Sequence, residues 1–221
     1  MRLVLVRHGE TTWNAIGRIQ GRTDTILSEK GILQAKGIAK MLSSEKPVKI
    51  YSSTLKRAVD TAQIIAKEHG MKVEKRHELD EINYGIFEGK TFTEIEDDPV
   101  LGGLWNERRK DKYNFKPQNG ESFVEMDENR VSPFVQKVIS DFFKKTVVIV
   151  AHSGTNRLIA GNCLHLPKDK MVNIWQPNEC VNFIDCDEKK CYYSHQLVGS
   201  KEPKNGYLTV HDIQKWGELF K

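Results

Sequence analysis

The sequence predicts an α/β protein, a three-layer α/β/α sandwich with a mainly parallel central sheet and a small inserted lid lobe. Short apolar, β-branched runs occur at Arg2–Val6, Val48–Tyr51 and Thr146–Val150, as expected of buried strands. Segments with a helical spacing of apolar residues follow each run. A helix between successive strands is the usual connection within a parallel sheet that is covered on both faces.

The first predicted strand, Arg2–Val6, ends at the polar residues Arg7 and His8. After a loop, Ser28 is the predicted N-cap of a helix that ends before Pro47. The apolar residues expected on its buried face are Ile32, Ala35, Ala39 and Leu42.

The second strand, Val48–Tyr51, leads through a polar turn into a second helix, for which Gly70 supplies the C-cap. The apolar residues on one side of this helix are Leu55, Ala58, Ala62, Ile65 and Ala66. Met71–Val73 is predicted as a short third strand.

In the C-terminal half, Phe123–Phe143 predicts a helix that breaks or kinks at Pro133. Thr146–Val150 has the strongest strand pattern of the chain, and a helix over about Asn156–Leu164 follows it. Further on, Cys191–Val198 predicts another strand.

Residues 91–118 fit this pattern poorly, and we interpret them as the inserted lobe or lid. Acidic residues come first, then Gly102 and Gly103, then a basic run between residues 108 and 116. The basic residues are Arg108, Arg109, Lys110, Lys112 and Lys116. They either form a solvated face or attract a multiply anionic substrate.

Composition places the chain among ordinary globular proteins. Its 221 residues are 38% hydrophobic and 29% charged, so we expect a single domain over 1–221, with an insertion at about 91–118 and an atypical tail at about 187–221. No apolar run is long enough to cross a bilayer, and we expect a cytoplasmic protein without a membrane partner. The formal charge of +4 comes from interspersed charges, so we expect no nucleic-acid partner.

The four cysteines are Cys163, Cys180, Cys186 and Cys191, and they show no C-x-x-C spacing. We therefore expect free thiols and neither a zinc site nor a redox site.

Chemically versatile side chains follow three of the predicted strands. Arg7 and His8 follow the first strand, Arg57 lies shortly after the second, and His152 and Ser153 follow the strand Thr146–Val150. Because ligands of open α/β sheets bind beyond the carboxyl ends of the strands, these residues are expected to meet at one edge. Arginines match phosphate oxygens and a histidine can act as a nucleophile, so the set favours phosphoryl transfer.

The segment from Arg7 to Asn14, R-H-G-E-T-T-W-N, resembles the first motif of the histidine phosphatase superfamily, in its phosphoglycerate mutase-like branch. Further matching segments follow in the family's order, and the resemblance covers roughly Arg2–Asp185. These segments are Leu27–Gly31 with Gln34 and Ala35, Ser52–Ser53 through Arg57–Ala58 with Thr61 and Ala62, Leu79–Glu81 with Gly85 and Glu88–Gly89, Gly120–Ser122, and His152–Gly154 with Arg157.

The resemblance implies a phosphatase that needs neither metal nor cofactor and forms a phosphohistidine on His8. It implies that Arg7, Arg57 and His152 bind the phosphoryl oxygens and that Glu81 protonates the leaving group and then activates water. Without the family motif, Glu78, Asp80 and Glu88 would be equally good candidates for this acid. The resemblance also implies substrate-binding roles, which fall to Asn14, Gln20, Ser153 and Gly154.

Three alternatives stay open at this stage. A cofactor-dependent phosphoglycerate mutase would return the phosphoryl group to substrate, but the segment Asn83–Gly89 looks like the phosphatase version. A catalytically silent phosphate-binding protein on the same fold is a non-enzyme alternative. A metal site formed by His8, Glu10 and His152 lacks any supporting motif spacing.

The expected substrate is a small phosphomonoester such as a sugar phosphate, a phosphorylated three-carbon acid, phosphoserine or α-ribazole phosphate. Phosphotyrosine in proteins is a further candidate. Near the C-terminus, a helical apolar stripe is expected either to dock on its own domain or to form a homodimer contact. The stripe consists of Ile213, Trp216, Leu219 and Phe220.

Overall fold

The computed structural model describes residues 1–209, which contain a central sheet of seven strands in the order β3-β2-β4-β1-β6-β7-β8. The strands are β1 Arg2–Arg7, β2 Pro47–Ser52, β3 Val73–Lys75, β4 Thr146–Ala151, β6 Cys180–Cys186, β7 Cys191–Leu197 and β8 Lys204–Asn205. Strands β3, β2, β4 and β1 are parallel, and β6, β7 and β8 extend the sheet in antiparallel fashion. A second, two-stranded sheet pairs β5 Ile174–Trp175 with β9 Leu208–Thr209.

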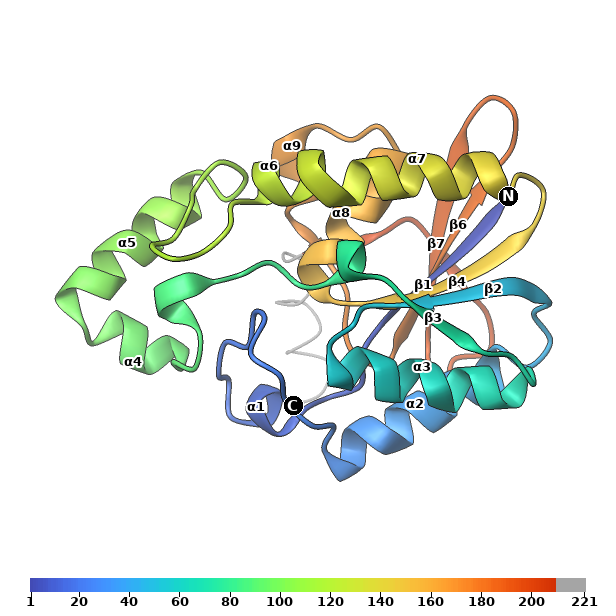
Figure 1. Ribbon diagram of the computed structural model, residues 1–221, viewed down its shortest axis with the longest axis horizontal. Coiled ribbons are helices and arrows are strands. Elements are labelled where there is room, and N and C mark those ends of the chain that lie inside the picture. The colour runs from blue at the N-terminus through green and yellow to red at the C-terminus, as the bar shows by residue number, and fades with distance from the viewer. Residues whose placement is uncertain (210–221) are drawn as a thin grey trace.

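Helices cover both faces of the sheet and give the three layers predicted from the sequence (Figure 1). Helices α2 Glu29–Met41 and α3 Lys56–Glu68 lie on one face, and α7 Ser132–Asp141 and α8 Ser153–Cys163 lie on the other. Because side chains alternate along a strand, Val4 and Val6 of β1 pack on the first face while Leu3 and Leu5 pack on the second. The central strand is therefore buried on both sides, as the apolar run in the sequence indicates.

The predicted helices and strands are present, with shifts at several ends. Helix α2 begins after Ser28, whose side chain accepts a hydrogen bond from the amide of Gly31, but Ile32 lies 38% exposed rather than in the core. Strand β3 begins at Val73, where we had expected it to end. Helix α8 begins at Ser153, three residues before the predicted start at Asn156.

The long predicted helix near residues 123–143 is divided by a π-helical turn. Helix α6 Phe123–Met126 runs into this turn, Asp127–Val131, and α7 begins at Ser132. Pro133 thus lies in the first turn of α7, directly after the π-helical turn. The helix does not break at the proline: its regular hydrogen bonding changes just before it, and the backbone stays helical throughout.

The predicted insertion contains two helices, α4 Phe92–Glu96 and α5 Pro99–Lys110, which lie apart from the sheet (Figure 1). Their contacts centre on Phe87 and Trp105, whose rings are 5.0 Å apart. Four further helical elements of the described chain are short. They are α1 Thr12–Ala15, the 3-10 turns His77–Leu79 and Gly85–Phe87, and α9 Lys168–Met171.

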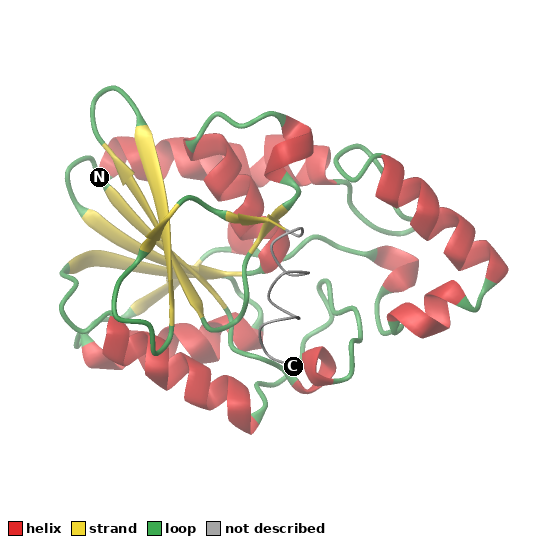
Figure 2. Cartoon of the chain, turned by 180° about the vertical axis from the view of Figure 1, so that it is seen from behind, coloured by secondary structure: helices red, strands yellow, loops and turns green. Residues whose placement is uncertain are grey.

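The C-terminal part of the main sheet holds one strand that the sequence predicts, β7, and two that it does not, β6 and β8. Strand β6 pairs with the opposite edge of β1 from β4, and the hairpin partner β7 confirms the strand expected at Cys191–Val198 (Figure 2). The apolar stripe between Ile213 and Phe220 lies outside the described residues. Within residues 1–209, no helix has the length and apolar character that a bilayer crossing requires.

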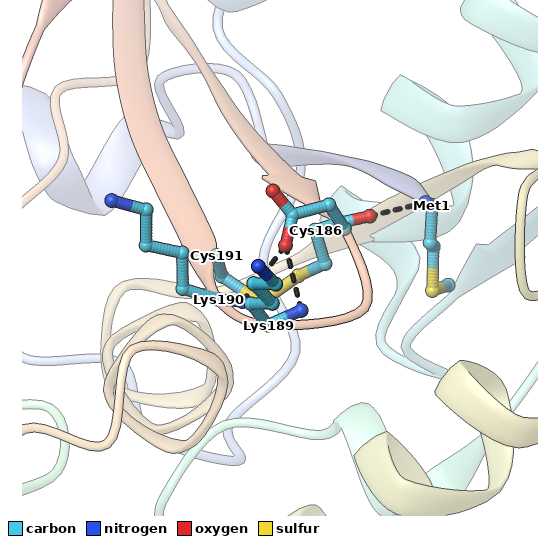
Figure 3. Close-up of a disulfide and its surroundings, with 6 residues drawn as sticks. Met1, Cys186, Lys189, Lys190 and Cys191 are labelled. Atoms are coloured by element: carbon cyan, nitrogen blue, oxygen red, sulfur yellow. Dashed lines mark hydrogen bonds between the residues drawn. A yellow bond between two sulfur atoms is a disulfide. The ribbon is translucent and has the colours of Figure 1, made fainter.

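The expectation of four free thiols is wrong for two of them. Cys186 and Cys191 face each other across the β6–β7 hairpin and form a disulfide, which Figure 3 shows beside the N-terminal amine of Met1. Sequence spacing alone did not reveal this pair, because it arises from strand register. The other two, Cys163 and Cys180, are buried and free, and burial raises the pKa of each thiol to about 12.

Disulfides persist mainly in oxidising compartments. The pair of Cys186 and Cys191 therefore does not support the cytoplasmic location expected from the sequence.

Close backbone packing at the start of α2 generates a stability prediction. A Cβ atom at Gly31 would lie 2.0 Å from the carbonyl oxygen of Glu10, so Gly31→Ala should lower the free energy of unfolding by about 1–3 kcal/mol or more. The control is Gly103→Ala within α5, where a Cβ atom meets nothing within 4 Å, and it should stabilise by about 0.5–1 kcal/mol. Chemical denaturation measures both, and equal midpoints for the two variants would contradict the prediction.

Candidate active site

The carboxyl ends of β1, β2 and β4 meet at one edge of the sheet, and His8, Ser53 and His152 follow them directly. The amide of His8 donates to the carbonyl of Ala151 over 3.0 Å, and the amide of Ser53 donates to Val150 over 3.1 Å. These bonds extend the parallel pairing by one residue and hold the three side chains at the same edge.

Beside them lies a cavity of about 380 Å³ that is lined by polar and by aromatic side chains. The polar lining residues are Arg7, His8, Asn14, Arg18, Gln20, Arg57, Glu81, Ser153 and Arg157. The aromatic wall consists of Tyr84, Phe92, Trp105 and Trp175. A cavity lined by both aromatic and polar side chains is typical of small-molecule sites.

His8 is 3% exposed, and its ring has a defined tautomer. Its Nδ1 lies 2.8 Å from the carbonyl oxygen of Gly9. Because a carbonyl only accepts, Nδ1 carries the proton and Nε2 keeps its lone pair. Burial, together with the positive charges of Arg57 and Arg7, holds the pKa of His8 well below its usual range, so the ring is neutral and Nε2 is available as a nucleophile.

His152 is fully buried and has the opposite tautomer. Its Nε2 lies 2.8 Å from the hydroxyl of Ser53, and that hydroxyl donates to the Asp80 carboxylate over 2.7 Å. Since the single hydroxyl proton goes to Asp80, Nε2 of His152 is the donor and Nδ1 has the lone pair. Burial and the charge of Arg57 also keep the pKa of His152 well below its usual range.

Nδ1 of His152 is buried and finds no hydrogen-bond partner among residues 1–209. The ring centroids of His8 and His152 are 5.2 Å apart. A buried polar atom without a partner is rare in folded proteins and often marks a place where a ligand binds.

Arg57 and Arg7 are held by backbone carbonyls. Arg57, 1% exposed, donates to the carbonyls of Thr23 and Gly21 over 2.9 and 2.6 Å, and Arg7 donates to Gln176 over 3.1 Å. Within the described chain neither arginine has a carboxylate within salt-bridge distance, and the Nε atom of each is buried without a partner. Burial lowers the pKa of both arginines, that of Arg7 to about 10. Both guanidinium groups therefore remain charged at neutral pH and can bind an anion.

Glu81 lies in the same cavity and is 7% exposed. Its two carboxylate oxygens accept hydrogen bonds from the amides of Ile82 and Gly154 over 3.0 and 3.1 Å. Arg130 fixes the loop that carries Glu81, donating to the carbonyls of Asp80 and Glu81, while its other contacts reach the Glu121 carboxylate.

The structure brings all nine predicted site residues to this place. Seven of them line the cavity: Arg7, His8, Asn14, Gln20, Arg57, Glu81 and Ser153. His152 lies behind His8, and Gly154 contacts Glu81 so closely that a Cβ atom there would come within 2.4 Å of the Glu81 carboxylate.

Sequence reasoning missed the residues that support these side chains. Ser53 and Asp80 stand beside predicted positions, but only the tertiary structure joins them to His152. The aromatic wall comes from four separate segments, so no local pattern could have identified it. Arg157 was matched as a family residue without a role in the site.

The arrangement disfavours the metal-site alternative. The Glu10 carboxylate that would complete it is bonded to Lys30 and Ser28 over 2.9 and 3.0 Å. In the part of the chain that the structure describes, no group of three or more His, Cys, Asp or Glu side chains is placed to hold a metal ion.

Comparison with known proteins agrees with the resemblance seen in the motifs. The model of the histidine phosphatase superfamily (branch 1) matches residues 3–196. Phosphoserine phosphatase 1 of Hydrogenobacter thermophilus is 35% identical over 221 residues, which is 100% of this chain and 96% of that protein. A metal-independent phosphoserine phosphatase of Arabidopsis thaliana is 38% identical over 160 residues, 71% of this chain and 66% of that protein.

Among solved structures, the mycobacterial glucosyl-3-phosphoglycerate phosphatase complexed with VO3 superposes with a TM-score of 0.75. It is 32% identical, and the superposition covers 83% of this chain and 90% of that one. Both the sequence and the fold of this chain are thus shared with phosphatases.

The buried neutral histidines make stability depend on pH. Both rings fold with a depressed pKa, so below the ordinary value of about 6.5 the unfolded chain binds more protons than the folded chain. The free energy of unfolding therefore falls as pH decreases, by up to about 1.4 kcal/mol per pH unit for each histidine.

His152→Asn should reduce this slope, measured by urea denaturation between about pH 7 and pH 5. The control His77→Asn removes a ring that is 81% exposed and should keep the wild-type slope. If His152→Asn and the wild type have the same slope, the prediction is wrong.

Proposed function

This chain belongs to the histidine phosphatase superfamily, branch 1, and is a phosphatase, and from that premise we propose that it hydrolyses small phosphomonoesters through a phosphohistidine on His8. The observation that carries the proposal is a neutral histidine with a free Nε2 beside two arginines that have no carboxylate partner. A phosphoryl dianion fits this combination, because it takes both the nucleophile and the unpaired positive charge.

In the first step, Nε2 of His8 attacks phosphorus and the bond from phosphorus to the substrate oxygen breaks. Glu81, protonated for this step, transfers its proton to the leaving oxygen. In the second step, Glu81 removes a proton from water, water oxygen attacks phosphorus, and the bond to Nε2 breaks. Inorganic phosphate leaves, His8 is neutral again, and Glu81 has its proton back.

Arg7 and Arg57 hold the phosphoryl oxygens and stabilise the charge that spreads over them in the transition state. His152 contributes through Nδ1, which takes up a proton when the dianion offsets the surrounding positive charge and then donates to a phosphoryl oxygen. Asn14, Gln20, Ser153 and Gly154 complete the binding of this group. Because these residues supply the positive charge themselves, we propose a reaction that needs no metal ion.

The substrate class follows from the cavity and from the relatives. A cavity of about 380 Å³ accommodates a small metabolite. The relatives named above carry the names of phosphoserine and glucosyl-3-phosphoglycerate phosphatases. We therefore place the substrate among small phosphorylated metabolites.

Replacing the nucleophile tests the mechanism directly. His8→Ala should abolish turnover and should trap no phosphate on the protein after brief exposure to labelled substrate and acid quench. Losing a single charged donor costs about 10²- to 10³-fold in kcat, and losing the nucleophile should cost more. Residual activity within about tenfold of wild type would exclude His8 as the phosphoryl acceptor.

The same assay separates hydrolysis from mutase activity. Phosphate release is measured with a chelator present on a panel of phosphomonoesters, including 3-phosphoglycerate with and without 2,3-bisphosphoglycerate. Release of phosphate supports the proposal. Isomerisation that outpaces release would favour a mutase, and no turnover of any compound would favour a phosphate-binding protein.

The bond from His152 to Ser53 predicts a positioning effect. Ser53→Ala removes the acceptor of the Nε2 proton and the link to Asp80, so kcat should fall by about 10- to 100-fold, the usual cost of losing an orienting partner. Thr54→Val is the matched control, because its amide and the Ser53 hydroxyl still bind Asp80. Equal kcat values for the two variants would show that the tautomer of His152 is set elsewhere.

A further inference from the structure

We propose that the cavity selects phosphomonoesters with a second anionic group, and that Arg157 binds this group with Arg108 reinforcing it from behind. The inference rests on the proposed function, since it concerns the part of the substrate that stays attached to the leaving oxygen. It names both a substrate class and the residues that recognise it.

Arg157 is a further guanidinium of the cavity, in addition to Arg18 and to the two assigned to the phosphoryl group. It lies in the second turn of α8 and donates from Nη1 to the carbonyl of Val172 over 3.1 Å. Its Nε is buried without a partner, and among residues 1–209 no carboxylate lies within salt-bridge distance of it. A buried guanidinium without a counter-ion is unfavourable unless an anion binds, and its fork suits a carboxylate or a phosphate.

Arg108 adds positive charge immediately behind the aromatic wall. Its side chain is 9% exposed, and the guanidinium lies 4.6 Å from the ring centre of Trp105 and 5.3 Å from that of Tyr84. Both rings line the cavity. Within the described chain Arg108 has no carboxylate partner either. No neighbouring carboxylate therefore neutralises its positive charge, which makes the cavity more favourable for an anion.

Lys112 also lacks a carboxylate partner within residues 1–209. Its Nζ donates to the amide oxygen of Asn173 over 2.6 Å. Burial lowers the pKa of Lys112, and the charges of Arg157 and Arg108 lower it further. Arg157 and Lys112 thus bond to the adjacent residues Val172 and Asn173.

The other members of the basic run are paired or exposed. Arg109 forms an ion pair with Glu96 over 2.8 Å, and Lys116 forms one with Glu125 over 2.5 Å. Lys110 is exposed. Of the alternatives left open by the sequence, a solvated face fits these three residues, and attraction of a multiply anionic substrate fits Arg108.

The balance of charges in the cavity also favours a substrate with a second anionic group. Arg18 is paired with Glu94 over 3.6 Å, which leaves Arg7, Arg57 and Arg157 against the carboxylate of Glu81. When Glu81 is protonated for the first step, three arginines face a phosphoryl dianion, and His152 adds a further positive charge once the dianion is bound. The remaining charge, with Arg108 behind it, matches one further anionic group.

Matched substrate pairs test the inference. 3-Phosphoglycerate is compared with glycerol 3-phosphate and phosphoserine with phosphoethanolamine, so that each pair differs chiefly in a carboxylate. Fructose 1,6-bisphosphate and fructose 6-phosphate test a second phosphate. The wild type should favour the more anionic member of at least one kind of pair by about 10- to 100-fold in kcat/KM, as expected for charge-assisted hydrogen bonds.

In Arg157→Gln this preference should collapse toward unity, mainly through KM for the more anionic member, and Arg108→Gln should reduce it partly. Arg109→Gln is the control and should keep the wild-type preference, because Arg109 is already paired with Glu96. A wild type that hydrolyses both members of every pair equally well overturns the inference and leaves the phosphatase intact. The same preference in wild type and Arg157→Gln also overturns it, whereas a wild type that releases no phosphate overturns the function on which it rests.

Discussion

Unpaired positive charge beside two neutral histidines is the constraint on which the rest of this structure depends. Burying an arginine without a counter-ion is costly, and here the cost is offset by carbonyl groups rather than by carboxylates. The carbonyls of Gly21 and Thr23 hold Arg57, and that of Gln176 holds Arg7. Carbonyl partners orient a guanidinium while leaving its net charge intact.

The two histidines are held in opposite tautomers. A backbone carbonyl fixes the proton of His8 on Nδ1, and the Ser53 hydroxyl, itself committed to Asp80, fixes the proton of His152 on Nε2. The lone pair therefore lies on Nε2 of His8 and on Nδ1 of His152. With the rings 5.2 Å apart and both pKa values depressed, neither competes for protons at neutral pH, and the neighbouring arginines keep both of them neutral until an anion enters.

Much of this site was predictable because parallel strands end at one sheet edge. That rule placed Arg7, His8 and His152 together from the sequence alone, whereas Glu81 and Gln20 needed the family motif, since an acidic loop has no periodicity that singles out one carboxylate. Strand β6 escaped prediction because its run is interrupted by the buried polar residue Asn182, which bonds to the carbonyl of Leu5 in the neighbouring strand. Only the assembled sheet makes such a residue a core residue. For the same reason the disulfide and the roles of Arg108 and Arg157 depend on contacts between distant segments.

Glu81 and His152 are linked through the start of α8. The amide of Gly154 donates to Glu81, and the hydroxyl of Thr155 donates to the carbonyl of Asp80, whose carboxylate in turn binds Ser53 beside His152. A shift of the acid loop would therefore move the group that sets the tautomer of His152, and the reverse also holds. Because His8 is tied to the same edge through the carbonyl of Ala151, His8, His152 and Glu81 share one hydrogen-bonded frame. Arg157 belongs to the same helix, α8, so the residue that we propose to bind the second anionic group is attached to this frame as well.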